Sequence, residues 1–216
     1  MSSDIIIMTT AIDRPELHAK VLESYKQYIS NVNVQWIITI NNVLNNVTET
    51  EANFRNILSD YNLHIKTYET GGTKKDWFNS VKYCIDTAHT LNTNIGYLFL
   101  EDDWLCNVSD TLNNDMRLVT DTNSHISLAS RDAVSFNPGI WGKEAFEKLM
   151  HFPINNLDLG LGARFNDGEN TNAERICCPH PESTNFINNF KSVNRFRDIG
   201  REWQYKTIKT RTFNIK

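Results

Sequence analysis

The chain has 216 residues, of which 40% are apolar and 22% are charged, and its formal net charge is −4. This length suits a single α/β domain with a sizeable core, and the composition excludes a disordered chain. The longest apolar runs, at 5–8 and 97–100, are far shorter than the roughly 20 residues of a membrane span. The N-terminus also lacks the basic flank of a signal peptide. We therefore expect a soluble, cytoplasmic protein.

Short runs rich in Ile and Val alternate with helix-length segments over the first hundred residues. We predict strands at 4–10, 34–40, 63–68 and 95–100, and helices at 15–29, 50–61 and 75–90. Asp13 is expected to cap the first helix, with Pro15 in its first turn. The alternation predicts βαβ units and a mostly parallel sheet, in which a ligand lies beyond the carboxyl ends of the strands. All four strand ends are polar: Thr9–Arg14, Asn41–Asn42, Thr70–Lys75 and Glu101–Asp103.

Glu101, Asp102 and Asp103 directly follow the fourth predicted strand. Three adjacent carboxylates repel one another in a crevice that is less polarisable than water. A divalent cation would relieve that repulsion, and Mg²⁺ or Mn²⁺ prefers such oxygen ligands and commonly bridges them to substrate phosphates. The alternative is a loop in which the acids face water. The triplet therefore indicates either a metal–diphosphate site or a solvated turn.

The order of these segments resembles nucleotide-sugar-dependent glycosyltransferases of the GT-A fold, especially those similar to family 2. The stretch from Ile5 to Leu17 looks like the opening strand of that family and its Asn-Arg-Pro-type turn, with Asp13 in place of Asn. Trp77-Phe78-Asn79 resembles the Arg-Asn element of its third helix, and 97–103 resembles its DXD strand end. Residues 137–146 resemble the acceptor-side strand and the helix after it. Short length and many Asn residues would also suit a viral or phage enzyme.

The resemblance implies an α/β, Rossmann-type three-layer α/β/α fold with a mixed, mostly parallel central sheet. One domain would cover 1–216, with a nucleotide-sugar half at 1–105, an acceptor half at 106–190 and a basic tail at 191–216. Asp103 would bind Mn²⁺ or Mg²⁺, and His180 is a possible further ligand, although a loop histidine also commonly faces solvent. The expected nucleotide-sugar contacts are Thr9, Thr10, Asp13, Arg14, Asn41, Asn42, Gly71, Gly72, Lys75, Trp77, Asn79, Glu101 and Asp102.

Two departures from the family pattern concern the nucleobase and the catalytic base. The second strand ends in Asn41-Asn42, where the family often has an acid that holds the nucleobase. Amides can still hydrogen-bond the edge of a base, so this departure puts in doubt which nucleobase is bound, and not the binding itself. Asn155 and Asn156 align with the expected general base, and an amide cannot accept a proton at neutral pH. Asp158 is therefore the candidate base of an inverting transfer. Alternatively, it is an acid favoured by a helix N-terminus.

Several other residues have both a functional and a structural interpretation. Gly71 and Gly72 could let the backbone approach a nucleotide, with Lys75 nearby, or form an exposed turn. Trp104 and Trp141 are candidates to line an acceptor cleft, although Trp is frequently a core residue. The four cysteines lack metal-ligand spacing, and we expect reduced thiols.

The C-terminal segment carries a charge opposite to that of the rest of the chain. Residues 191–216 contain eight Lys and Arg against two Asp and Glu, a net of +6, which leaves −10 on the first 190 residues. Arg197 and Arg201 could contact a diphosphate or an anionic acceptor such as nucleic acid. The alternative is a docked basic helix that pairs with the acidic body; we expect a turn and then a short helix over 194–203.

The sequence thus predicts a metal-dependent glycosyltransferase that moves a sugar from a nucleotide-diphosphate sugar, with UDP-sugars favoured, to a hydroxyl. The acceptor would be a glycan or, for a phage enzyme acting in the host cytoplasm, a hydroxymethylated pyrimidine in DNA. Two alternatives stay open. One is a non-catalytic module of GT-A origin that binds nucleic acid or glycan. The other is a nucleotidyltransferase, which usually has a Gly-rich loop with Arg and Lys after its first strand.

Overall fold

The structure is a computed structural model that describes residues 3–71, 74–108, 111–130, 134, 137–151 and 185–200. Its first half contains β1 (Ser3–Ile12), α1 (Pro15–Tyr28), β2 (Val34–Asn41), α2 (Val47–Ile57), β3 (Asn62–Tyr68), α3 (Lys74–His89) and β4 (Thr93–Phe99). Its second half contains β5 (Trp104–Cys106), α4 (Leu112–Met116), β6 (Ser124–Ser127), β7 (Gly139–Gly142), α5 (Lys143–His151), β8 (Asn189–Ser192) and β9 (Phe196–Asp198). Every strand and helix predicted for the first hundred residues is confirmed. In these ranges, no helix has the length and apolar character needed to cross a bilayer.

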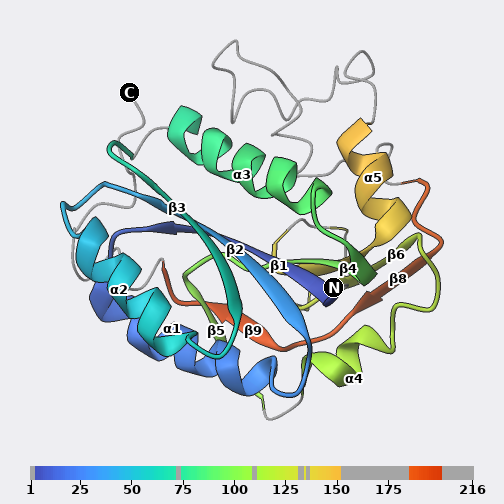
Figure 1. The fold of residues 1–216 in the computed structure, drawn as a ribbon. Helices are drawn as coiled ribbons and strands as arrows, with labels where there is room; N and C mark the ends of the chain where they lie inside the picture. Colours follow the sequence, from blue (N-terminus) through green and yellow to red (C-terminus); the bar gives the residue numbers. More distant parts are fainter. Residues whose placement is uncertain are drawn as a thin grey trace.

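Seven strands form the central sheet in the order β3-β2-β1-β4-β7-β6-β8 (Figure 1). Strands β1 to β4 are parallel to one another. Strand β7 runs antiparallel to both of its neighbours, β4 and β6, and β8 is parallel to β6. The sheet is therefore mixed and mostly parallel, as predicted, and helices cover both of its faces.

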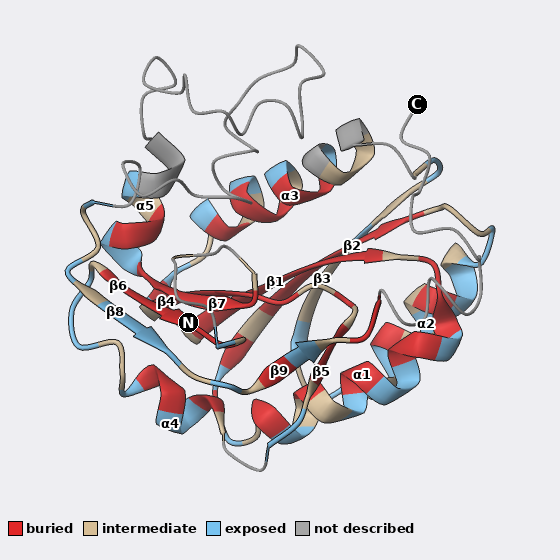
Figure 2. Cartoon of the chain, turned by 180° about the vertical axis from the view of Figure 1, so that it is seen from behind, coloured by how far each residue is buried: buried red, intermediate tan, exposed pale blue. Residues whose placement is uncertain are grey.

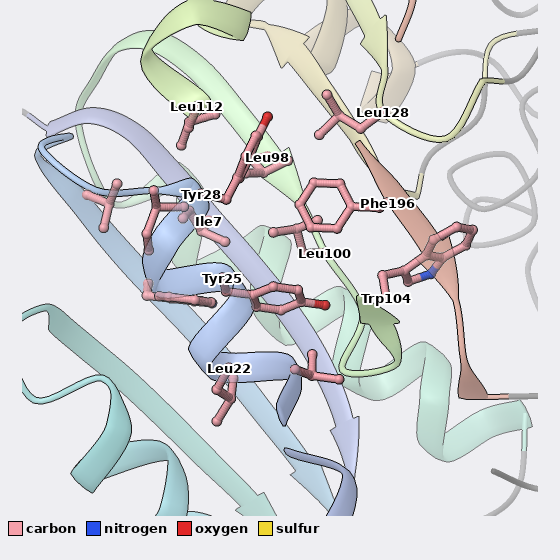
Figure 3. Close-up of a cluster of buried hydrophobic side chains, with 14 of the residues drawn as sticks. Ile7, Leu22, Tyr25, Tyr28, Leu98, Leu100, Trp104, Leu112, Leu128 and Phe196 are labelled. Atoms are coloured by element: carbon pink, nitrogen blue, oxygen red, sulfur yellow. The ribbon is translucent and has the colours of Figure 1, made fainter. Parts of the chain in front are cut away.

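The apolar residues of β1 alternate between two cores, because successive side chains of a strand point to opposite faces. Ile5 and Ile7 face a core that includes buried residues of α1, α2 and α4, whereas Ile6 and Met8 face a core with α3 and α5. Figure 2 shows the buried residues along the sheet and on the inner sides of the helices. Figure 3 shows the first of these cores, in which Tyr25 and Tyr28 of α1 lie near Phe196. The ring centroids are 5.8 and 4.9 Å from that of Phe196.

The start of the basic C-terminal segment belongs to the fold. Strand β9 pairs antiparallel with β5 in a separate two-stranded sheet. The helix predicted over 194–203 is therefore wrong at Phe196–Asp198, where buried Phe196 and exposed Arg197 alternate as in a strand. Arg195 forms two-pronged contacts with the buried carboxylate of Asp115, at 2.9 Å from each oxygen. This arrangement supports the interpretation of a docked tail, at least for Arg195.

Candidate active site

A pocket of roughly 210 Å³ lies at the carboxyl ends of β1, β2 and β4, where the sequence predicts a ligand crevice. The start of α3 and the residues around the end of β9 complete its wall. Its lining brings together seven of the predicted site residues: Thr10, Arg14, Asn41, Trp77, Glu101, Asp102 and Asp103. Ala11, Ile12, Asp198 and Gly200 complete the lining.

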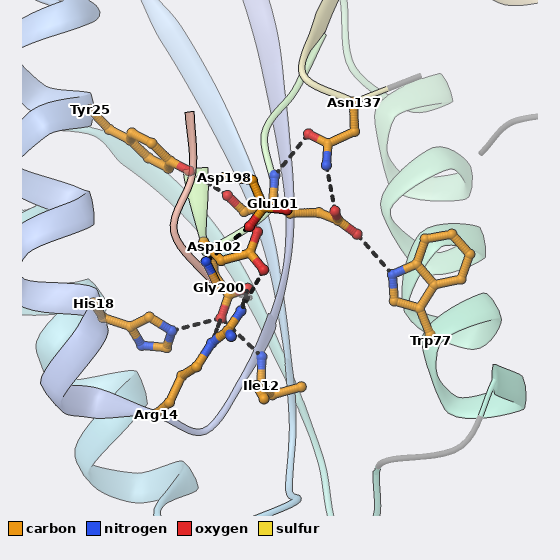
Figure 4. A network of polar contacts seen from close by, with 11 residues as sticks. Ile12, Arg14, His18, Tyr25, Trp77, Glu101, Asp102, Asn137, Asp198 and Gly200 are labelled. Atoms are coloured by element: carbon orange, nitrogen blue, oxygen red, sulfur yellow. Dashed lines mark hydrogen bonds and ion pairs between the residues drawn. The ribbon is translucent and has the colours of Figure 1, made fainter. Parts of the chain in front are cut away.

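Arg14 pairs with two of the three acids that follow β4, and Figure 4 shows its contact with Asp102. Its Nη2 lies 2.5 Å from Asp102 Oδ1 and 3.2 Å from Asp103 Oδ2. Its Nε donates to Asp102 Oδ2 at 3.0 Å, so the contact with Asp102 is bidentate. The repulsion among the acids is therefore partly relieved within the chain, by a side chain that the sequence had suggested as a nucleotide contact.

Asp102 is held by donors from two further groups. Nε2 of His18 lies 2.8 Å from Asp102 Oδ2, and the backbone N–H of Ile12 donates to the same oxygen at 3.2 Å. Burial by itself would raise the pKa of Asp102, but the charge of Arg14 and the hydrogen bond from His18 outweigh it. The pKa is therefore lowered below its usual range, and Asp102 stays ionised.

Glu101 sits in a cradle made by α3 and the residue that precedes Pro138. Trp77 Nε1 donates to Glu101 Oε1 at 3.1 Å, and the amide of Asn137 donates to Oε2. The backbone N–H of Glu101 donates to Asn137 Oδ1 at 3.2 Å, and Tyr25 donates to the Glu101 carbonyl. Burial and the charges of Asp103 and Asp102 raise the pKa of Glu101 to about 8.

Asp103 lies against the C-terminal segment. The N–H of Ile199 donates to the Asp103 carbonyl at 2.9 Å. A Cβ on Gly200 would lie 2.0 Å from Asp103 Oδ2, so the close approach requires glycine. The pKa of Asp103 is raised to about 6 by burial and by the charges of Asp102 and Asp198, against the opposing charge of Arg14.

The acids of the pocket fit a divalent cation in charge and in donor type. Asp102, Asp103 and Asp198 line the pocket with one lining cation, Arg14. Burial first, and then the charges of the neighbouring carboxylates, raise the pKa values of Glu101 and Asp103. Their oxygens are the ligands that Mg²⁺ and Mn²⁺ prefer. Within the described residues, however, no group of three His, Cys, Asp or Glu side chains could hold a metal. Further ligands would have to come from phosphate, water or the remaining parts of the chain.

Two polar side chains on the α3 side of the pocket have different hydrogen-bonding states. Asn41 exchanges hydrogen bonds with Ser80 of α3, with its Nδ2 2.8 Å from Ser80 Oγ and its Oδ1 3.2 Å from the same atom. Thr10 is 3% exposed, and its hydroxyl has no hydrogen-bond partner among the residues that the structure describes. A buried hydroxyl without a partner is costly. Thr10 lines the pocket, and its hydroxyl oxygen is itself buried.

Other predicted nucleotide contacts lie away from the pocket or serve the fold. The fully buried Thr9 accepts a hydrogen bond from Trp36 Nε1 at 2.9 Å, on the face opposite to Thr10. Asp13 accepts from the backbone N–H groups of Val43, Leu44 and Asn46 and so anchors the loop after β2. It does not cap α1, whose cap residue is Arg14.

Three further predicted contacts lie after β2, before α3 and on α3. Asn42 donates to the carbonyl of Glu69 at 3.1 Å. Gly71 lies so close to Asn41 that an added Cβ would be 2.8 Å from the Asn41 Cβ. Asn79 is exposed on α3. The pocket lining includes none of the three.

The pocket lining includes neither of the two tryptophans nor Arg197. Trp141 is fully buried in the core under α5, with its ring centroid 4.1 Å from that of His125. Trp104 is 8% exposed and packs in the core with α1. Neither indole lines the pocket, because the apolar rings are taken up by packing. Arg197 is exposed. Neighbouring residues of a strand point to opposite faces, so Arg197 points away from the pocket that Asp198 lines.

Some predicted residues lie outside the described residues: Gly72, Asp158, His180 and Arg201, together with the side chain of Lys75. Cys84 and Cys106 are free thiols, as expected.

His18, Asn137 and Asp198 belong to the site but were not predicted. His18 stands four residues after Arg14 on the first helix, and that spacing places both side chains on one helix face. The spacing was a usable signal. Asn137 and Asp198 carry no such local signal, because they reach the acids only through the path of the chain.

A scan of protein-family models and a search of curated protein sequences give no match. Among solved structures, S. aureus TarS 1–349 in complex with UDP superposes with a TM-score of 0.54 at 11% identity. It covers 91% of this chain and 60% of that one. The chain has a GT-A fold.

Further solved structures resemble this GT-A fold. A second TarS structure gives a TM-score of 0.52 at 11% identity and covers 91% of this chain and 36% of that one. The mannosyltransferase PcManGT from Pyrobaculum calidifontis, in complex with GDP-Man and Mn²⁺, gives a TM-score of 0.44 at 14% identity. This match covers 61% of this chain and 36% of that one. The chain therefore spans less than two thirds of the length of these proteins.

Proposed function

We propose that the pocket binds the nucleoside diphosphate of a nucleotide sugar and that the chain transfers the sugar to a hydroxyl acceptor. The observation that carries this proposal is the combination of groups at the ends of β1, β2 and β4. An arginine and several acidic side chains lie in the same pocket as Thr10, whose hydroxyl has no hydrogen-bond partner within the described residues. A GT-A fold supports the same interpretation.

The nucleoside would lie against Thr10, Asn41 and Trp77. Thr10 offers a hydroxyl, Asn41 offers an amide that can donate and accept, and Trp77 offers an aromatic ring. TarS 1–349 is in complex with UDP. A uridine nucleotide is therefore the first donor to test on this chain.

The diphosphate would lie near Arg14 and Asp103. Asp103 would hold Mn²⁺ or Mg²⁺, with Glu101 and Asp102 in support and His180 as a possible further ligand. A divalent cation there would neutralise charge that develops on the leaving diphosphate. Arg14 contributes a permanent positive charge to the same wall, since its pKa is raised above its already high usual value by Asp102 and Asp103, against the opposing effect of burial.

The residues that we propose for the acceptor lie outside the described ranges. If the transfer inverts the configuration, Asp158 would take the proton from the acceptor hydroxyl. The acceptor would be a glycan or a hydroxymethylated pyrimidine in DNA. With a DNA acceptor, Arg201 would contact the phosphates of the nucleic acid.

The test is a panel of nucleotide sugars incubated with the protein and Mn²⁺, with measurement of the released nucleoside diphosphate. We expect at least one donor to be turned over and the matching nucleoside diphosphate to raise the melting temperature. Asp103→Asn should abolish both effects, whereas Asp86→Asn, on the exposed side of α3, should not. Binding without turnover would favour the non-catalytic module. No response to any donor, with no thermal shift from UDP or GDP, would refute the proposal.

A further inference from the structure

Asp102 depends on a histidine that does not itself line the pocket. His18 is fully buried on α1, and its ring packs edge-on against Phe54 at 5.0 Å between centroids. Its Nε2 lies 2.8 Å from Asp102 Oδ2. Its Nδ1 has no hydrogen-bond partner within the described part of the chain. A hydrogen on Nδ1 would lack an acceptor there, so these contacts favour the tautomer that donates from Nε2 to Asp102.

The hydrogen bond with His18 fixes the terminal torsion of the Asp102 side chain, that is, the orientation of its carboxylate plane. The terminal torsion of an aspartate is broad, so its carboxylate plane turns easily. A bidentate pair with arginine requires that plane to match the plane of the guanidinium. Asp102 Oδ2 receives His18 Nε2 and Ile12 N in addition to Arg14 Nε. These additional donors hold Oδ2 in place and leave Oδ1 directed at Arg14 Nη2.

We propose that His18 is a positioning residue that acts through Asp102 to hold the Arg14 guanidinium in place for the diphosphate. This role rests on the proposed function, because it concerns nucleotide binding in the same pocket. Figure 4 shows His18 and Arg14 in contact with the same carboxylate of Asp102. His18 is not among the residues that line the pocket.

The test compares substitutions of His18 in the full chain by calorimetric titration with UDP and Mg²⁺. His18→Met removes the donor and keeps an apolar side chain, and we expect UDP to bind about 10- to 100-fold more weakly, as for a lost hydrogen bond to a charged group. His18→Gln carries an N–H at nearly the reach of Nε2 and should restore most of the affinity. Phe54→Leu is the matched control, since it disturbs the same ring contact without the hydrogen bond. It should lower stability but leave UDP affinity unchanged.

A double-mutant cycle separates positioning from a purely structural role. If His18 acts through Arg14, then His18→Met should cause no further loss of UDP affinity in an Arg14→Met background. Equal losses in both backgrounds, or a folded His18→Met variant that binds UDP like the wild type, would overturn the proposal. If the wild type binds neither UDP nor GDP, the proposed function itself fails, and the positioning role fails with it.

A second measurement uses the unmodified protein and so does not depend on how variants fold. In a sample with ¹⁵N-labelled histidine, the ring signals of His18 should show hydrogen on Nε2 and should shift when UDP and Mg²⁺ are added. Two results would contradict the proposal. One is a His18 signal that shows the hydrogen on Nδ1, and the other is a His18 signal that does not shift although UDP binds to the protein.

Discussion

Arg14 and Asp102 are 88 residues apart in the sequence, yet they form a buried bidentate pair with contacts of 2.5 and 3.0 Å. The pair joins the turn after β1 to the turn after β4, which are the two strand ends at the centre of the pocket. Arg14 cannot leave this position cheaply, because both side chains are almost completely buried. The pair therefore stabilises the fold and also supplies the fixed positive charge of the proposed diphosphate site.

Asp102→Asn should lower the free energy of unfolding by about 3 kcal/mol or more, the effect expected when one partner of a buried ion pair loses its charge. Urea denaturation measures this loss. Asp86→Asn is the matched control, since its 2.5 Å contact with Lys82 is exposed on α3 and should be worth less than about 1 kcal/mol. Equal small losses for both variants would show that the Arg14 pair is not essential to stability.

Arg195→Met should destabilise the protein, whereas Arg197→Ala should not. Arg195 faces the fully buried Asp115, which also accepts from Tyr28 at 2.8 Å. We expect a loss of roughly 2–3 kcal/mol, somewhat below that of a fully buried pair because the Arg195 side chain keeps 20% of its exposure. Arg197, two residues along, is exposed and serves as the control. The melting temperatures of both variants measure the difference. A stable Arg195→Met protein would mean that this segment is not docked through Asp115.

Gly200→Ala should weaken metal-dependent nucleotide binding and also lower stability, because the added methyl group would lie 2.6 Å from Asp103 Cβ, which rotation of the carboxylate does not move away. The new methyl group would lie 2.0 Å from Asp103 Oδ2 and 2.6 Å from Asp103 Cγ, so the carboxylate must move. We expect UDP with Mn²⁺ to bind roughly tenfold more weakly, as when a group that holds a metal ligand is lost. Lys191→Ala, at an exposed position of β8, is the control. Unchanged affinity in Gly200→Ala would place the cation away from Asp103.

Cys84 should resist alkylation in the folded protein. Burial raises the pKa of its thiol to about 12, and a thiol that is ionised only above that pH has almost no reactive thiolate at pH 8. Iodoacetamide at pH 8 should leave the Cys84 peptide unmodified in mass spectra of the native protein and label it after urea unfolding. Rapid native labelling would mean that the core between β2 and α3 opens easily.

The fold could be predicted from the first hundred residues because each strand and helix there has its own periodic pattern. The position of the site also followed, since carboxyl ends of parallel strands meet at one edge. The roles of single residues were harder to predict. Thr9 and Thr10 look alike in the sequence, yet only Thr10 faces the pocket, because neighbouring strand residues point to opposite faces.

The remaining errors have one physical origin, which is contact between segments distant in sequence. The acids after β4 gave no sign that Arg14, at the end of another strand, pairs with two of them. Trp104 next to those acids suggested a cleft, but α1 covers it. Asp198 and Gly200 reach the pocket only because β9 pairs with β5. No local pattern predicts such a pairing between strands of three residues.

The most direct test of the central claim is the position at which a nucleoside diphosphate binds. A crystal structure of the protein grown with UDP and Mn²⁺ measures it. We expect the nucleoside against Thr10 and Asn41, and the diphosphate between Arg14 and a cation on Asp103. Nucleotide bound elsewhere on the chain, with the pocket at the ends of β1, β2 and β4 left without it, would contradict the account.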